Sequence, residues 1–149
     1  MRVSVIGGST VSPVEYATAE ELGRILAERG HTVVCGGLGG VMEAVSRGAS
    51  EAGGETIGLL PTDDPADANE YVDIAVATGI GHARNVMVPM NGDAVIAVDG
   101  GPGTLSEIAL SQVYDRPVAG IGTHDVEGVE HVETPQDAVE YVEQAVEGD

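Results

Sequence analysis

Hydrophobic and polar positions follow two patterns that alternate along the chain. Short apolar runs, typical of buried strands, are separated by longer stretches in which apolar positions recur every three or four residues, as in amphipathic helices. Strands are expected at residues 2–6, 31–35, 55–60, 71–76, 93–98 and 117–121, with a further short one near 131–132. Helices are expected at residues 13–29, 41–52, 81–90, 105–114 and 135–146.

This alternation predicts an α/β fold, a doubly wound parallel sheet of about six to seven strands with helices on both faces. All 149 residues are expected to form one domain, because the loops at 62–69 and 122–130 are too short for a second one. Along the last helix, Ala138, Val139, Val142 and Val146 recur at helical spacing. Such a face can pack on the helix's own sheet or on a partner.

Three glycine-rich segments follow predicted strands, and in a doubly wound sheet they lie along the carboxyl edge, where ligands bind. The third lies between the apolar run 94–98 and a helix. It therefore combines backbone N–H groups with the positive end of a helix, which is an anion site and most often binds phosphate. The candidate ligand-binding residues in these segments are Gly7, Gly8, Ser9, Gly36, Gly37, Gly39, Gly40, Gly100, Gly101, Gly103 and Thr104.

Two charged residues are candidates for the same site. Glu107 brings a carboxylate close to the third glycine segment, although Thr104-x-x-Glu107 also fits a capping box that only starts a helix. Arg84 follows the fourth strand and can neutralise a phosphate or carboxylate; the alternative is a surface salt bridge worth ~0–1 kcal/mol. Because these residues follow strands four and five, expected to be neighbours, we expect them to face one another across the crevice.

Three other residues have more than one interpretation. Met42 follows the second glycine segment and either lines a base pocket or packs in the core. His82 is either an acid–base group or an ordinary surface histidine. Cys35 ends a buried strand and is expected in the core.

Composition narrows the function classes. The net charge is −19, the six basic residues are all arginine, and Phe and Trp are absent. Acid excess without lysine predicts a halophilic protein from a high-salt cytoplasm, where charge repulsion is screened; an ordinary acidic protein is the alternative. Such a chain is not expected to bind nucleic acid or anionic membranes. The absence of lysine excludes a pyridoxal-phosphate Schiff base and a lysine-containing P-loop within these residues.

Other sequence features indicate the cellular location. No apolar run is long enough to span a bilayer, and no signal peptide is expected because a strand begins at Arg2. The single cysteine excludes an internal disulfide and fits a reducing cytoplasm. The four histidines show no metal-ligand spacing, so no metal site is expected.

Together these motifs resemble the LOG-like proteins, also called lysine decarboxylase-like. Residues 100–107 (GGPGTLSE) are similar to the GGxGTxxE signature of that family, and residues 35–45 and 52–61 are similar to its other glycine-rich segments. Arg84-Asn85 stands at the place of the family's RK or RN pair. The resemblance covers residues 3 to about 121, and it implies a Rossmann-like fold that holds a nucleotide-like ligand.

The resemblance points to two branches of the family, which differ in function. In LOG enzymes, which release a base from nucleoside 5′-monophosphates, the catalytic arginine and glutamate correspond to Arg84 and Glu107. The shorter chain, Asn85 in place of lysine and the GGLGG loop are more similar to the molybdenum-cofactor carrier-like branch. We therefore expect a binding protein for a phosphorylated small molecule, with a phosphoribohydrolase as the alternative and a nucleotide sensor without turnover as a third. No cofactor is expected to be required, and the bound molecule would be a nucleoside monophosphate or a molybdopterin-type cofactor.

Oligomerisation is also implied by the resemblance. Relatives in the LOG-like family form dimers or tetramers, so a homo-oligomer of one of these sizes is expected.

Overall fold

The computed structural model describes residues 1–148. Within them, seven strands form one sheet in the order β4-β3-β2-β1-β5-β6-β7, and every neighbouring pair is parallel. The strands are β1 (Arg2–Gly7), β2 (Thr32–Cys35), β3 (Thr56–Leu60), β4 (Ile74–Ala77), β5 (Ala94–Val98), β6 (Val118–Ile121) and β7 (Val129–His131). The predicted doubly wound parallel sheet is therefore confirmed.

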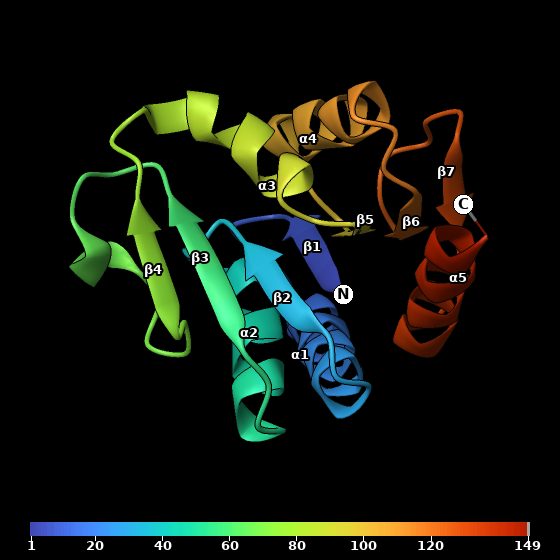
Figure 1. The fold of residues 1–149 in the computed structure, drawn as a ribbon, viewed down its shortest axis with the longest axis horizontal. Helices are drawn as coiled ribbons and strands as arrows, with labels where there is room; N and C mark the ends of the chain where they lie inside the picture. The colour runs from blue at the N-terminus through green and yellow to red at the C-terminus, as the bar shows by residue number, and fades with distance from the viewer. Residues whose placement is uncertain (149) are drawn as a thin grey trace.

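Helices cover both faces of this sheet (Figure 1). One layer holds α1, α2 and α5, and the other holds the short α3 and the longer α4. The helices are α1 (Pro13–Glu28), α2 (Val41–Glu51), α3 (Met87–Met90), α4 (Pro102–Val113) and α5 (Pro135–Glu147), with 3₁₀ helices η1 (Pro65–Asp67) and η2 (Gly81–Val86). Both α1 and α5 begin with a side-chain cap, from Ser12 and Thr134, followed by proline.

The strand order reverses at β1. The chain runs outward from β1 through β2 and β3 to β4, then returns across the sheet to place β5 on the other side of β1. In register, Val5 of β1 lies beside Ile96 of β5, and Val3 lies beside Val33 of β2. The crevice of the fold therefore opens at the carboxyl end of β1, between the loops that follow β1 and β5.

The expectation that strands four and five are neighbours is wrong. β4 is an edge strand, and β3, β2 and β1 lie between it and β5. The sequence shows the alternation of elements but not the direction in which each strand is added. Arg84 nevertheless reaches the centre of the sheet, because η2 and α3 form the returning segment that passes over the carboxyl ends of the intervening strands (Figure 1).

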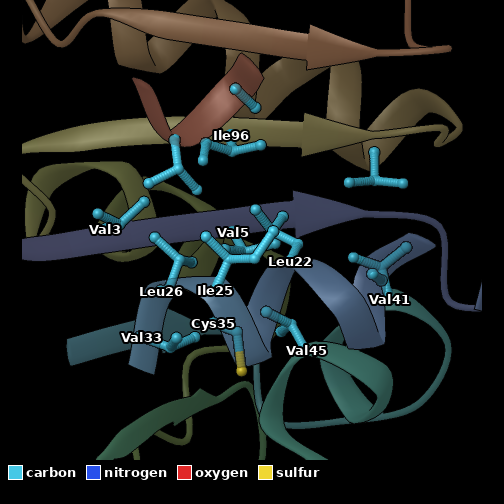
Figure 2. Packing of buried hydrophobic residues seen from close by; sticks show 14 of the residues in the cluster. Val3, Val5, Leu22, Ile25, Leu26, Val33, Cys35, Val41, Val45 and Ile96 are labelled. Atoms are coloured by element: carbon cyan, nitrogen blue, oxygen red, sulfur yellow. The ribbon is translucent and has the colours of Figure 1, made fainter. Parts of the chain in front are cut away.

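The larger core lies between the sheet and the layer of α1, α2 and α5. Figure 2 shows Leu22 and Leu26 lying between their own helix, α1, and strand β1, and both are fully buried. Close helix packing depends on glycine: a Cβ at Gly48 of α2 would lie 1.9 Å from the carbonyl oxygen of Glu20 in α1. Cys35 is also fully buried, which confirms its assignment to the core.

The last helix packs on its own molecule. Ala138, Val139 and Val142 of α5 are fully buried in the same cluster as residues of α1, and Val146 packs against its edge. The apolar face of α5 is therefore covered within the chain, and the partner alternative for this helix does not hold.

The fourth strand and the helix expected at 81–90 both differ from their predicted form. The fourth strand begins three residues later than expected, because Asp73 and Thr56 are joined by side-chain hydrogen bonds: Asp73 N–H donates to Thr56 Oγ1 at 3.0 Å, and Thr56 N–H donates to Asp73 Oδ2 at 2.9 Å. The helix expected at 81–90 is a 3₁₀ helix followed by one α-turn. Pro89 has no N–H to donate to the preceding turn, which interrupts regular α-helix bonding there.

Candidate functional site

The loops that follow β1, β2 and β5 enclose a cavity of about 420 Å³ at the carboxyl edge of the sheet. The η2 segment adds a fourth wall, so residues far apart in sequence meet around one space. This volume is in the range of small-molecule sites. The predicted site residues that line it are Gly7, Gly8, Ser9, Gly36, Met42, Arg84, Asn85, Gly101, Gly103, Thr104 and Glu107.

Four predicted ligand-binding glycines lie outside this lining: Gly37, Gly39, Gly40 and Gly100. Three of them fix the shape of the walls. Gly40 has φ +66°, and a Cβ there would lie 2.2 Å from the Gly8 carbonyl oxygen, which also accepts the Val41 N–H at 3.0 Å. Gly37 faces the β3 backbone, and Gly100 faces the Thr104 side chain. Their direct contact with a ligand remains a prediction.

The turn after β5 presents unbonded amides. Asp99 has φ 54° and Gly100 φ 115°, and this left-handed pair turns the chain sharply into α4. Within residues 1–148, the N–H groups of Gly101, Gly103 and Thr104 have no protein acceptor. They lie at the N-terminus of a twelve-residue helix, where free amides and the helix dipole favour an anion.

The capping-box interpretation of Glu107 is wrong. Helix α4 begins at Pro102, with Gly101 as the N-cap and no side-chain cap, so Thr104 is already inside the first turn. Proline is favoured at the first helical position, which explains the earlier start. Glu107 therefore lies more than one turn into the helix, and its carboxylate faces the cavity instead of the helix terminus.

Arg84 and Glu107 are both buried at the cavity, each with 8% of its surface exposed. Burial lowers the pKa of Arg84, and the Glu107 charge opposes that shift. Burial raises the pKa of Glu107 from 4.5 to about 7, and the Arg84 charge opposes that shift in turn. Among the described residues, no direct ion pair joins them and Arg84 Nε has no hydrogen-bond partner. The surface-salt-bridge alternative for Arg84 therefore does not hold.

Glycine allows the arginine to reach this position. A Cβ at Gly36 would lie 2.5 Å from Arg84 Nη1 and 2.6 Å from Met42 Sδ. The glycine after β2 thus makes room for the guanidinium, and Met42, 8% exposed, contributes both to the core and to the cavity wall.

Several lining residues were not expected from the sequence. Val5 and Ile6 form an apolar part of the wall at the end of β1, and Leu38 and Pro61 extend it. His82, named as an acid–base candidate from the sequence, also lines the cavity with an exposed side chain, so its acid–base role stays a prediction.

Within residues 1–148 there is no group of three or more side chains of the metal-binding types. In the same part of the chain, no helix has both the length and the apolar character needed to cross a membrane.

Sequence comparisons identify the family to which the chain is similar. A family model described as the SLOG cluster4 family matches residues 1–147. An uncharacterized protein of Archaeoglobus fulgidus is 42% identical over 142 residues, which is 95% of this chain and 93% of that protein. A probable cytokinin riboside 5′-monophosphate phosphoribohydrolase of Oryza sativa subsp. japonica is 35% identical over 130 residues, covering 78% of this chain. The chain spans only 52% of that enzyme's length.

Solved structures are similar over nearly the whole chain. The molybdenum cofactor binding protein of Rippkaea orientalis has a TM-score of 0.91 at 34% identity, covering 97% of this chain and 96% of its own. The Moco carrier protein of Chlamydomonas reinhardtii has a TM-score of 0.89 at 32% identity, and the match covers 99% of this chain and 98% of that protein. The match over residues 1–147 shows that the chain belongs to the SLOG cluster4 family, in the LOG-like group of Rossmann folds that includes Moco carrier-like proteins.

Proposed function

We propose that the cavity binds a phosphorylated, nucleotide-like molecule of the molybdopterin type, and that the protein acts as its carrier. One observation carries this proposal: three unpartnered amides at the start of α4 face the same cavity as the buried Arg84. A phosphate accepts hydrogen bonds from such amides and is attracted by both the helix dipole and the guanidinium. The similarity to Moco carrier and binding proteins supports the choice of ligand.

The rest of the cavity suits a flat ring system. Leu38, Met42 and Pro61 supply apolar surface, and the glycines leave the backbone open to close approach. On this basis the amides of Gly101, Gly103 and Thr104 would hold the phosphate. The molybdenum-bearing ring would lie against the apolar wall as cargo, so this chain needs no resident cofactor.

A hydrolase is the second candidate, because Glu107 has a pKa of about 7. A carboxylate that ionises near neutral pH can stabilise the positive charge that develops on ribose when a base leaves, or assist the attacking water. Arg84 would hold the substrate, and water would form the new bond to the anomeric carbon as the glycosidic bond breaks. The phosphoribohydrolase relatives support this candidate, although they are about twice as long.

Two assays on one preparation separate these functions. Equilibrium dialysis against molybdenum cofactor released from a purified molybdoenzyme measures retained molybdenum, and chromatography measures free base after incubation with AMP, GMP and CMP in molar KCl. A carrier retains molybdenum and releases no base. Base release identifies the hydrolase, and the absence of both overturns both proposals.

We further propose that the protein works in a salt-rich cytoplasm as a homo-oligomer. The net charge of −19 supports the first point. The second is supported by Ile74 and Val76 of β4, which are 45% and 39% exposed. Parallel sheets are normally covered on both faces, so this apolar surface is suited to contact with a second copy.

A further inference from the structure

The back of the anion-binding turn, residues 99–104, is held by the loop that joins β6 to β7. Thr123 Oγ1 donates to the Asp99 carbonyl oxygen at 2.7 Å, and His124 Nε2 lies 3.0 Å from the Gly101 carbonyl oxygen. The Asp99 N–H also donates to the Ile121 carbonyl oxygen at 3.1 Å. Two consecutive side chains thus contact alternate carbonyl groups of one turn.

The donor and acceptor roles follow from chemistry. A carbonyl oxygen only accepts, so His124 must carry its hydrogen on Nε2 in this contact. The same Gly101 oxygen accepts the Leu105 N–H at 3.0 Å, which is the first hydrogen bond of α4. His124 is therefore a second donor on the carbonyl group that starts the helix.

Holding these carbonyl groups also restricts the amides that face the cavity. Gly100 packs against the Thr104 side chain, but a Cβ at Gly101 would have no neighbour within 4 Å, so packing restrains Gly101 little. Glycine has the largest backbone freedom to lose on ordering. Bonds to the carbonyls on both sides of Gly100 reduce that freedom before a ligand arrives, which favours affinity by preorganisation.

We propose that Thr123 and His124 are positioning residues that order the turn for phosphate binding. Neither lines the cavity, so both act through the turn backbone. This inference rests on the proposed function, since it assigns the two side chains to the phosphate end of the same site.

The loop has a separate attachment that provides a control. Gln112 Nε2 of α4 donates to the Glu127 carbonyl oxygen at 2.6 Å, four residues beyond Thr123. Replacing Gln112 with leucine removes this attachment of the loop and leaves both contacts to the turn. Two conservative variants complete the set. Thr123→Ser keeps the hydroxyl group, and His124→Gln keeps an amide N–H donor in the position of Nε2.

The test uses NMR on the full chain in molar KCl, with inorganic phosphate as the probe. Thr123→Val and His124→Leu are expected to lower backbone order parameters of residues 100–104 from about 0.85 toward 0.6. Each is expected to weaken phosphate affinity roughly three- to tenfold, the effect of one lost hydrogen bond. Thr123→Ser, His124→Gln and Gln112→Leu are expected to match the parent protein in both measurements.

Each result is decisive. The positioning role is overturned if Thr123→Val and His124→Leu keep the backbone order parameters or the phosphate affinity of the parent protein. This holds even when phosphate still shifts the NMR signals of the turn amides. Equal losses in Gln112→Leu also overturn it, because the effect would then belong to the loop as a whole. If phosphate does not shift the turn amides of the parent protein, the placement in the proposed function fails, and this inference fails with it.

Discussion

At the residue scale, the site is governed by one buried charge pair in which only one member can change its charge. Arg84 stays protonated despite the burial that lowers its pKa, because the pKa of arginine begins so far above neutrality. Glu107 responds instead, with its pKa raised to about 7. Below that pH the cavity carries an uncompensated positive charge, which favours a phosphorylated ligand.

Glu107→Gln is expected to change the pH dependence of stability. The pKa of about 7 in the folded state exceeds the ordinary glutamate value of 4.5, so the folded state retains a proton that the unfolded state has lost. The parent protein therefore loses stability as pH rises through this window, by up to roughly 3 kcal/mol. Glutamine cannot ionise, so the variant should be relatively more stable at about pH 8 and similar to the parent at about pH 4. Urea unfolding across this range provides the measurement.

The control for that experiment is Glu55→Gln, which replaces an exposed glutamate before β3. The free energy of unfolding of this variant should differ little from that of the parent protein, and the difference should not vary with pH as it does for Glu107→Gln. A Glu107→Gln variant whose stability follows the parent at every pH would show that burial does not hold the proton on Glu107.

Arg84→Ala and Glu107→Ala should separate binding from catalysis. Loss of a charge-assisted contact at Arg84 is expected to weaken AMP binding roughly ten- to a hundredfold by calorimetry. In a carrier, Glu107→Ala changes affinity only modestly. In a hydrolase, the same variant leaves binding nearly intact and lowers base release by orders of magnitude, because the carboxylate acts in the transition state. Unchanged AMP affinity in Arg84→Ala would remove the arginine from the site.

At the element scale, the sequence predicts the type of most elements but not their placement in the sheet. Apolar runs and glycine pairs located each strand of the sheet, because buried parallel strands and their turns leave strong local patterns. The order of the strands depends on long-range packing, so β4 and β5 were placed together incorrectly. Arg84 and Glu107 nevertheless line the same cavity, since the returning segment crosses the crevice, and their role there stays a prediction.

The first turn of α4 shows the same limit of prediction from local sequence. Thr104 and Glu107 match a capping box by letter, but Pro102 begins the helix earlier, and the local pattern alone does not decide between these starts. The contacts from Thr123 and His124 could not be predicted at all, because they join segments more than twenty residues apart.

Gly103→Val is expected to abolish phosphate binding without unfolding the protein. A Cβ at Gly103 would meet only Asn85 Nδ2, at 3.7 Å, so the added side chain fits and obstructs the cavity wall. Gly100→Val is the matched contrast: its Cβ would lie 2.3 Å from Thr104 Oγ1 at φ 115°, which strains the turn by about 1–3 kcal/mol. Calorimetry and thermal melting of both variants distinguish obstruction from strain. Parental affinity in Gly103→Val would contradict this placement of the phosphate.

At the scale of the whole molecule, the sheet is covered unevenly. Ile74 and Val76 lie in register with Ile57 and Leu59 on the face that carries α3 and α4, and those helices leave β4 partly exposed. We expect a second copy to cover this surface. Val76→Lys should therefore lower the mass measured by light scattering in molar KCl to that of a monomer, 15.1 kDa. Val14→Lys, at a valine 76% exposed on α1, should leave the mass unchanged. A parent protein that is already monomeric would contradict the expectation.

Stability of the whole chain is expected to depend on salt. The excess of 19 negative charges is screened over ~3 Å in molar salt but repels over ~30 Å at about 0.01 M. The core offers limited compensation, because its largest fully buried side chains are Ile, Leu and Val, and each buries less apolar area than an aromatic residue. The melting temperature should therefore rise by roughly 10 °C or more between dilute buffer and molar KCl. Replacing the exposed Asp63 and Asp67 of one acidic loop with asparagine should reduce this slope, since fewer charges then need screening. A melting temperature independent of salt would show that the acidic composition serves solubility or partner choice instead of stability at high salt concentration.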